Sequence, residues 1–197
     1  MPSSPSQQHT SFDTTDTPNA GKRALLLTTA SLLWLPRKTL AVSSQDADFW
    51  TIPRSVRVIN AHTGQRQEFQ YWRDGTTIQT EYEALCTLCR DHHSGHAAYI
   101  SLRTINLMYA SQEWYWRVTR KRATTILSSA YRTSETNHRA GGSVDSYHLE
   151  GRALDGWMDG ISLQTFAKTL LYARAGGVGV YRKHIHWDDG PFRYWEN

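Results

Sequence analysis

The alternation of apolar and polar positions first becomes regular at residue 55. Val56 and Val58 alternate with polar residues, as expected for a strand with one buried face. A turn-forming segment follows at 62–65, and the aromatic-rich run 68–72 then leads into Asp74-Gly75. Two apolar runs that are bounded by turn residues predict a β-hairpin over 55–73.

Helical spacing of apolar residues replaces this alternation in the middle of the chain. It predicts two helices, each with one buried face, at about 79–90 and 101–120. The remaining pattern predicts a strand, a polar loop, a second strand, a third helix that Ser162 caps and Gly176-Gly177 end, and a final strand or hairpin. The first of these strands spans 124–130, the loop 133–145 and the second strand 152–157. The third helix spans 162–175, and the final strand or hairpin spans 178–188.

The N-terminal segment has a different character. Residues 1–20 are polar and lack periodicity, which is typical of disorder. Lys22-Arg23, an apolar run over 24–35 and small residues near 41 have the order of an export signal, for which both the general and the twin-arginine routes stay open. The run is too short to span a bilayer comfortably, although an uncleaved anchor remains an alternative.

This division predicts a disordered lead and export signal at 1–41, a linker at 42–54 and a folded domain at 55–197. The expected location is the periplasm or cell envelope, with no stable membrane span after signal removal. Hydrophobic content of 39% fits a folded domain. The net charge of +4 suits an anionic surface, but no dense basic stripe indicates nucleic acid. We expect a monomer.

Cys86 and Cys89 form a C-x-x-C pair that histidines follow at 92, 93 and 96. This spacing is compatible with a structural metal site or a redox pair. However, the segment also reads as a helix in which Leu85, Leu88 and Cys89 share an apolar face, and free cysteine packs well as a small hydrophobe. The apolar face is the favoured interpretation.

Metal-donor residues concentrate in two separate segments. His148 and Asp155 flank the small residues Gly151 and Ala153, which allow the backbone to pass close to a neighbour. In the second segment, His184, His186 and Asp188 share one face if the segment is a strand. Catalytic zinc sites commonly use three protein ligands and leave one position open, and His148, Asp155 and His186 supply such a set.

These motifs resemble a known enzyme family. The pattern S-x-H-x-x-G-x-A-x-D over 146–155, with a late H-x-H, is similar to the zinc peptidases of the lysostaphin, D-Ala-D-Ala metallopeptidase and hedgehog superfamily. Further motifs resemble its YcbK-like branch of murein endopeptidases. In the C-terminal half, these motifs are S-x-Y-R-T-x-x-T-N at 129–137, Gly141-Gly142, G-G-V-G-x-Y at 176–181, and H-x-D at 186–188 followed by Gly190. Upstream, they are H-T-G at 62–64, Trp72 and R-D-H at 90–92.

The resemblance covers about residues 55–195 and implies an α+β fold. A small antiparallel sheet, flanked by helices, would carry the metal site. The implied activity is zinc-dependent cleavage of peptide cross-links in peptidoglycan, with one Zn²⁺ ion held by His148, Asp155 and His186. A non-catalytic zinc-containing wall-binding module and a D,D-carboxypeptidase that acts on short peptides remain alternatives.

The resemblance also suggests roles around the metal. His184 is the candidate base or transition-state stabiliser, because related enzymes carry a base or a non-ligand histidine near this place. Arg132 has a planar donor fork suited to an oxyanion or a substrate carboxylate, and Ser146 is a candidate substrate contact. Lys183 stands where relatives often have a carboxylate, which favours the non-catalytic alternative.

Overall fold

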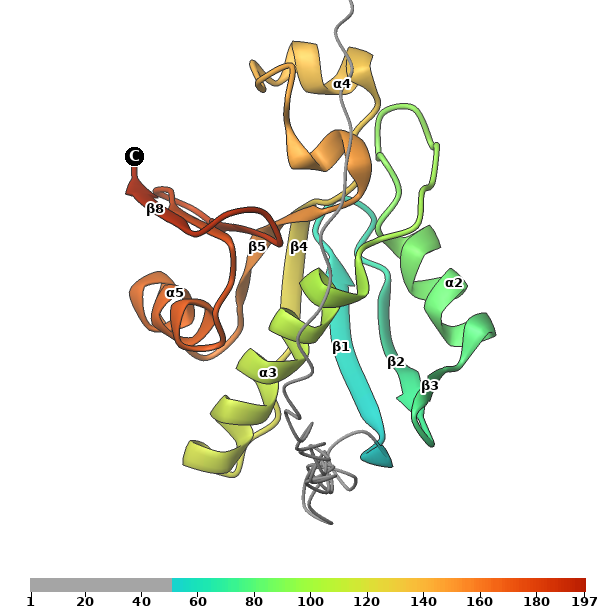
Figure 1. The fold of residues 1–197 in the computed structure, drawn as a ribbon, viewed down its shortest axis with the longest axis vertical. Helices are drawn as coiled ribbons and strands as arrows, with labels where there is room; N and C mark the ends of the chain where they lie inside the picture. The colour runs from blue at the N-terminus through green and yellow to red at the C-terminus, as the bar shows by residue number, and fades with distance from the viewer. Residues whose placement is uncertain (1–50) are drawn as a thin grey trace, which may run out of the picture. The chain divides into compact units, whose positions relative to one another are not determined.

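The structure, a computed structural model, describes residues 51–197 (Figure 1). The predicted lead and export signal at 1–41, and the linker up to residue 50, lie outside the described residues. Within residues 51–197, no helix combines the length and the apolar character that a membrane span needs.

A single mixed sheet of eight strands organises the described part of the chain, in the order β3-β2-β1-β4-β5-β7-β6-β8. The predicted α+β class is therefore confirmed, whereas the expectation of a small antiparallel sheet is wrong. Two neighbouring pairs, β1 with β4 and β6 with β8, run parallel. The strands span Arg54–Asn60, Arg66–Arg73, Thr76–Thr77, Thr125–Ser129, Ala153–Met158, Gly177–Val180, Ile185–Asp188 and Arg193–Glu196 for β1 to β8.

The predicted hairpin is confirmed as β1 and β2, which pair antiparallel. Asn60 shapes the turn between them, because its side-chain oxygen accepts hydrogen bonds from the N–H groups of His62 (2.9 Å) and Thr63 (3.1 Å). The parallel partner of β1 is β4, which is reached only after two helices. A long crossover of this kind is required between parallel strands, and sequence-local patterns do not reveal it.

The predicted helices are confirmed with small shifts in their ends, as α2 (Gln79–Leu88), α3 (Leu102–Thr119) and α5 (Leu163–Tyr172). Ser162 caps α5 as predicted, since its hydroxyl accepts from the N–H of Thr165. Two details differ. The predicted loop at 133–145 contains a short helix, α4 (Ser134–Arg139), and α5 ends before the glycines, with Arg174 in the left-handed region at φ 59°.

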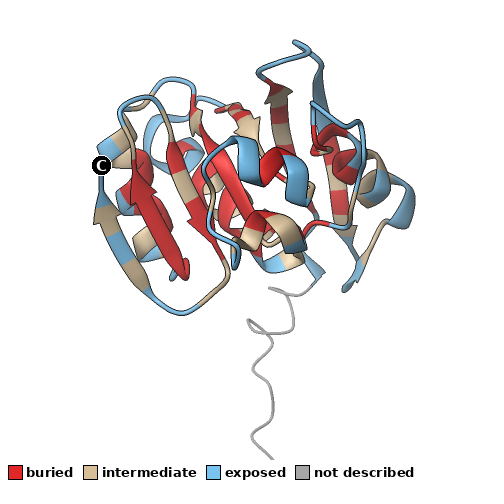
Figure 2. Cartoon of the chain, turned by 90° about the horizontal axis from the view of Figure 1, so that it is seen from above, coloured by how far each residue is buried: buried red, intermediate tan, exposed pale blue. Residues whose placement is uncertain are grey.

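The sheet separates a packed core from the face that carries the candidate site. On β7, Ile185 and Trp187 are fully buried, and the Trp187 ring packs edge-on against Phe166 of α5. Helix α3 packs against both β1 and α5 (Figure 1), and the strands in the middle of the sheet are mostly buried (Figure 2). Because side chains alternate along a strand, His186 and Asp188 point to the opposite face.

Candidate metal centre

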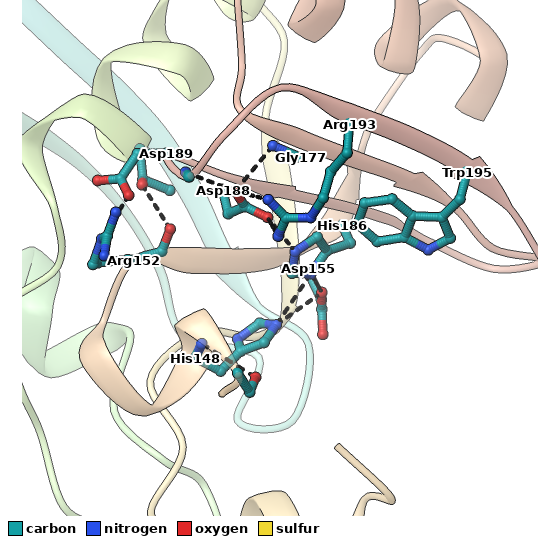
Figure 3. Close-up of polar contacts among 12 residues, drawn as sticks. His148, Arg152, Asp155, Gly177, His186, Asp188, Asp189, Arg193 and Trp195 are labelled. Atoms are coloured by element: carbon teal, nitrogen blue, oxygen red, sulfur yellow. Dashed lines mark hydrogen bonds and ion pairs between the residues drawn. The ribbon is translucent and has the colours of Figure 1, made fainter. Parts of the chain in front are cut away.

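Three potential ligands from separate parts of the chain converge on one point (Figure 3). Asp155 on β5 and His186 on β7 are directly opposed in the antiparallel ladder. The Oδ1 atom of Asp155 lies 2.8 Å from Nδ1 of His186 and 3.2 Å from Nε2 of His148. The two ring nitrogens are themselves 3.2 Å apart.

His148 reaches this point from a 3₁₀ helix, η1 (Tyr147–Glu150), that precedes β5. Ser146 caps η1 through its hydroxyl, which accepts from the N–H of His148 at 3.4 Å. Gly151 ends it in the left-handed region at φ +66°, where a Cβ atom would lie 2.3 Å from the carbonyl oxygen of Tyr99. Only glycine fits such a close approach, so Gly151 is the residue that can end η1 between His148 and β5.

The outer nitrogen of each imidazole already has a partner. Nδ1 of His148 donates to the carbonyl oxygen of Ala130 (2.5 Å), and Nε2 of His186 donates to the buried carboxylate of Asp188 (2.9 Å). These bonds leave the lone pair of each inner nitrogen directed at the centre. Such outer partners fix the tautomer and orientation of histidines that bind metals.

Electrostatics keep the carboxylate at this point charged. Burial raises the pKa of Asp155, but the charges and hydrogen bonds of His148 and His186 lower it by more, so the pKa falls well below its usual range. Burial lowers the pKa of His186, while hydrogen bonds to Asp155 and Asp188 raise it by more. An ionised carboxylate between two imidazoles forms a centre that attracts a cation.

The donor set fits zinc. Tetrahedral Zn²⁺ with nitrogen and oxygen ligands at their usual bond lengths separates the ligand atoms by about 3.3 Å. The separations at this site are 2.8 and 3.2 Å, which needs only small adjustments on metal binding. Within residues 51–197, His148, Asp155 and His186 form the only group of three such donors close enough to share an ion.

Arg132 lies beside this centre and contacts one of its members. Its Nη2 atom donates to Oδ2 of Asp155, and its Nε donates to the hydroxyl of Ser129 at 2.7 Å. The guanidinium therefore orients the carboxylate through the oxygen that does not face the histidines. The predicted contacts of Arg132 and Ser146 with substrate stay predictions, although both residues line the same groove as the three ligands.

His184 also lines this groove, at the end of the turn that connects β6 to β7. Burial lowers the pKa of His184, the charge of Asp155 raises it, and the charges of His186 and Arg132 lower it further, so that the net shift is downward. The imidazole is therefore neutral at pH 7 and able to accept a proton. Lys183 beside it is exposed and is not among the residues that line the groove.

The groove has a volume of ≈ 1130 Å³ and crosses the sheet on both sides of the centre. His62 and His92, near β1 and β4, line one part, and Trp195 of β8 lines another. The order of strands places these two parts at opposite ends, with the candidate ligands on β5 and β7 between them. The groove therefore extends to both sides of the candidate metal centre.

The upstream motifs contribute to one wall of this groove. The rings of His62 and His92 stack with centroids 3.6 Å apart, and His93 lies next to His92. Asp91 is buried and accepts from the backbone N–H (2.8 Å) and hydroxyl (2.9 Å) of Thr133, the N-cap residue of α4. It thereby connects the loop after α2 to the start of α4.

The C-x-x-C pair does not belong to this wall. Cys86 and Cys89 are both free and buried in the core, as the apolar-face interpretation expects. The Cys86 sulfur accepts from the N–H of Ile100 at 3.3 Å.

Sequence reasoning missed three residues around the centre. The sequence pattern puts Asp188 on the same face as His186 but indicates no role for it, and no motif includes Arg193 or Trp195. Arg193 donates to Asp188, and the Trp195 ring lies 5.4 Å from that of His186. Both lie on β8, which follows the last recognised motif and has no strong apolar pattern of its own.

Comparison with known proteins agrees with this geometry. A family profile described as peptidoglycan L,D-endopeptidase MepK matches residues 50–195. The peptidoglycan L,D-endopeptidase MepK of Escherichia coli (strain K12) is 33% identical over 150 residues, which cover 73% of this chain and 80% of that protein. The probable peptidoglycan L,D-endopeptidase MepK of Haemophilus influenzae is 26% identical over 169 residues, covering 82% and 87%. The chain therefore belongs to the MepK family of peptidases.

Proposed function

We propose that this protein is an exported, zinc-dependent peptidoglycan endopeptidase that hydrolyses L,D-peptide bonds in the cell wall. Family membership supports the reaction class, since the relatives are named peptidoglycan L,D-endopeptidases. The observation that carries the zinc dependence is the convergence of His148, Asp155 and His186, whose inner donor atoms are mutually within 3.2 Å. The continuous groove favours an endopeptidase over a carboxypeptidase, which needs a closed end.

His148, Asp155 and His186 would hold the zinc ion, which would supply Lewis acidity toward the scissile carbonyl and the attacking water. The chain itself must move the protons. His184 is neutral, lines the groove and lies close enough to Asp155 and His186 to interact electrostatically with them. It accepts a proton from the water and delivers it to the leaving amine, which is general acid–base catalysis.

Arg132 and Ser146 complete the proposed site. Arg132 holds Asp155 through Oδ2 and stabilises negative charge that develops on the substrate carbonyl. Ser146 holds the N-terminal end of η1 in place and offers its hydroxyl to the substrate peptide. Both residues line the groove, which supports these two roles.

A second candidate is a wall-binding module that keeps the metal but lacks hydrolysis. The observation in its favour is the exposed Lys183, two residues before β7 begins at Ile185, at a position where relatives often have a carboxylate. This alternative predicts zinc binding and retention on murein without release of fragments.

Digestion of purified murein sacculi tests the proposal. The protein, the protein with a chelator, and His186→Ala are compared for released muropeptides and for zinc content. His96→Ala is the matched control, because His96 is exposed and does not line the groove. We expect release by the wild type and by the control, and none in the other two samples. Full zinc content without products would replace the proposal by the binding module.

A further inference from the structure

Arg193 on β8 connects the C-terminal strand to the residue that holds His186. Its Nη2 atom donates to Oδ2 of Asp188 at 2.6 Å, and its Nη1 atom lies 3.3 Å from Oδ1 of the same carboxylate (Figure 3). This two-point contact uses the planar donor fork that arginine has and lysine lacks. The pair is partly shielded, since the Asp188 side chain is fully buried and that of Arg193 is 39% exposed.

Asp188 transmits this contact to the metal centre. Its Oδ2 atom also accepts from Nε2 of His186 at 2.9 Å, and its Oδ1 atom accepts from the N–H groups of Gly177 (2.9 Å) and Gly190 (2.8 Å). A carboxylate has about four acceptor positions, and the donors of His186, Gly177, Gly190 and Arg193 fill all of them. The direction in which His186 points is therefore set by a carboxylate that Arg193 and two backbone groups hold in place.

The Arg193 guanidinium touches the other side of the centre as well. It lies over the ring of Tyr147, 5.0 Å from its centroid, and Tyr147 directly precedes the ligand His148. It also lies 5.6 Å from the centroid of Trp195. One cation thus contacts residues adjacent to both histidine ligands, although it contacts neither ligand itself.

We propose that Arg193 is a positioning residue of the metal centre. It fixes Asp188, which holds the Nε2 proton of His186, and so directs Nδ1 of His186 at the point shared with His148 and Asp155. This inference rests on the proposed function for what the centre binds, but the positioning itself is a property of the chain. The alternative is that Arg193 only fastens β8 to the sheet.

The His186 Nε2 proton reports directly on this positioning, with or without a metal. Its exchange with solvent is measured by proton NMR on protein labelled with ¹⁵N-histidine. We expect slow exchange in the wild type. In Arg193→Ala, we expect exchange to be at least about tenfold faster. The Asp188 carboxylate is no longer held in place, so its hydrogen bond with His186 opens more often. Arg193→Lys keeps the cation but not the fork, so an intermediate rate is expected.

Arg152→Ala is the matched control. Arg152 also lies over the Tyr147 ring, at 4.5 Å, but it pairs with Asp189 and Glu150 rather than with Asp188. Its loss should leave the exchange of the His186 proton unchanged. Zinc affinity, measured by competition with a chelating dye, should fall about tenfold in Arg193→Ala, the lower end of the effect of such outer partners.

The proposal would be overturned if the His186 proton exchanged in Arg193→Lys at the same rate as in the wild type. The same holds for Arg193→Ala where that variant folds. Backbone amide spectra establish folding, and the lysine variant decides the matter if the alanine variant unfolds. A wild-type protein that releases nothing from sacculi would instead contradict the proposed function. The exchange rates would still decide the role of Arg193, so the two failures are distinguishable.

Discussion

His184 stacks on Tyr181 across the turn that joins β6 to β7, with ring centroids 4.7 Å apart and ring planes 9° from parallel. A backbone hydrogen bond from the N–H of Tyr181 to the carbonyl of His184, at 2.9 Å, closes the same turn. The ring of the proposed base is therefore held by an aromatic neighbour and a tight turn, two residues before the candidate ligand His186.

This arrangement predicts that His184→Ala loses turnover but keeps zinc. General acid–base groups contribute typically about 10²–10⁴-fold in rate, and we expect a fall of that size in muropeptide release. Zinc content should stay at the wild-type value, because His184 is not among the three converging donors. His96→Ala should behave as the wild type in both assays. Wild-type turnover in His184→Ala would remove this residue from the mechanism.

Metal removal should lower thermal stability. A ligand that binds only the folded state at 100 times its Kd adds about 2.7 kcal/mol to the free energy of unfolding. For a domain of this size, that corresponds to a shift in the unfolding midpoint of roughly 5–10 °C. Calorimetry of the protein with zinc and with excess chelator measures the shift. Asp155→Asn should show no zinc-dependent shift, and an equal shift in that variant would place the ion elsewhere.

The Arg132 side chain has two proposed effects, one on zinc binding through Asp155 and one on the substrate carbonyl, and a variant can separate them. Its contact with Asp155 predicts that Arg132→Ala weakens zinc binding by about 10–100-fold. The proposed stabilisation of the substrate carbonyl predicts a further loss of turnover at saturating zinc, by about 10²-fold or more. Zinc titrations and steady-state rates measure the two separately. If excess zinc restores full turnover, Arg132 orients Asp155 and does nothing more.

The periodic elements and the candidate ligand set could be predicted from the sequence because each strand, helix and motif depends on a local pattern. The β1–β2 hairpin and the helices α2, α3 and α5 follow from spacing within short windows. The convergence of His148, Asp155 and His186 was anticipated from donor type and motif order, although their roles await the experiments above.

Other features depend on partners distant in sequence. The size of the sheet follows from the pairing of β1 with β4 and of β6 with β8, which no local pattern specifies. The salt bridge between Arg132 and Asp155 and the contact of Arg193 with Asp188 likewise appear only once the strands are assembled. The sequence predicts a loop where α4 lies, because the six polar residues of this helix lack an apolar stripe and the helix begins at a Thr133 cap instead.

Asp91 gives a pH-dependent prediction at a distance from the metal. Burial raises the pKa of this carboxyl group, but hydrogen bonds from Thr133, Thr136 and His93 lower it by more, so the folded pKa falls below the ordinary value of 3.8. A depressed folded pKa means that ionised Asp91 stabilises the fold above the unfolded pKa. This contribution is lost as the pH falls below about 4 towards the folded value.

Asp91→Asn should therefore be less stable than the wild type at pH 7, by about 1–3 kcal/mol, since an amide cannot accept all these hydrogen bonds. The difference should shrink between pH 4 and the acid limit of folding, where the wild type loses its ionised carboxylate. Urea unfolding at a series of pH values measures both curves. A difference that stays constant down to pH 3 would show that the charge of Asp91 does not contribute.

Gly151 provides a test of how η1 presents His148. It adopts φ +66°, and a Cβ atom at this position would lie 2.3 Å from the carbonyl oxygen of Tyr99. Gly151→Ala therefore meets both the left-handed penalty of about 1–2 kcal/mol and a collision with backbone, for which overpacking costs of about 1–3 kcal/mol are typical. Because relief of the collision must shift η1, zinc affinity should fall together with stability.

Gly95→Ala is the matched control for this variant. Gly95 has φ +76°, but a Cβ atom there would have no heavy atom within 4 Å. It therefore carries the left-handed penalty without the collision, and it should lose only about 1–2 kcal/mol with no change in zinc affinity. Urea unfolding and chelator competition on both variants isolate the collision as the difference between them. Equal losses of stability with unchanged zinc affinity in both would mean that the approach of Gly151 to Tyr99 does not position His148.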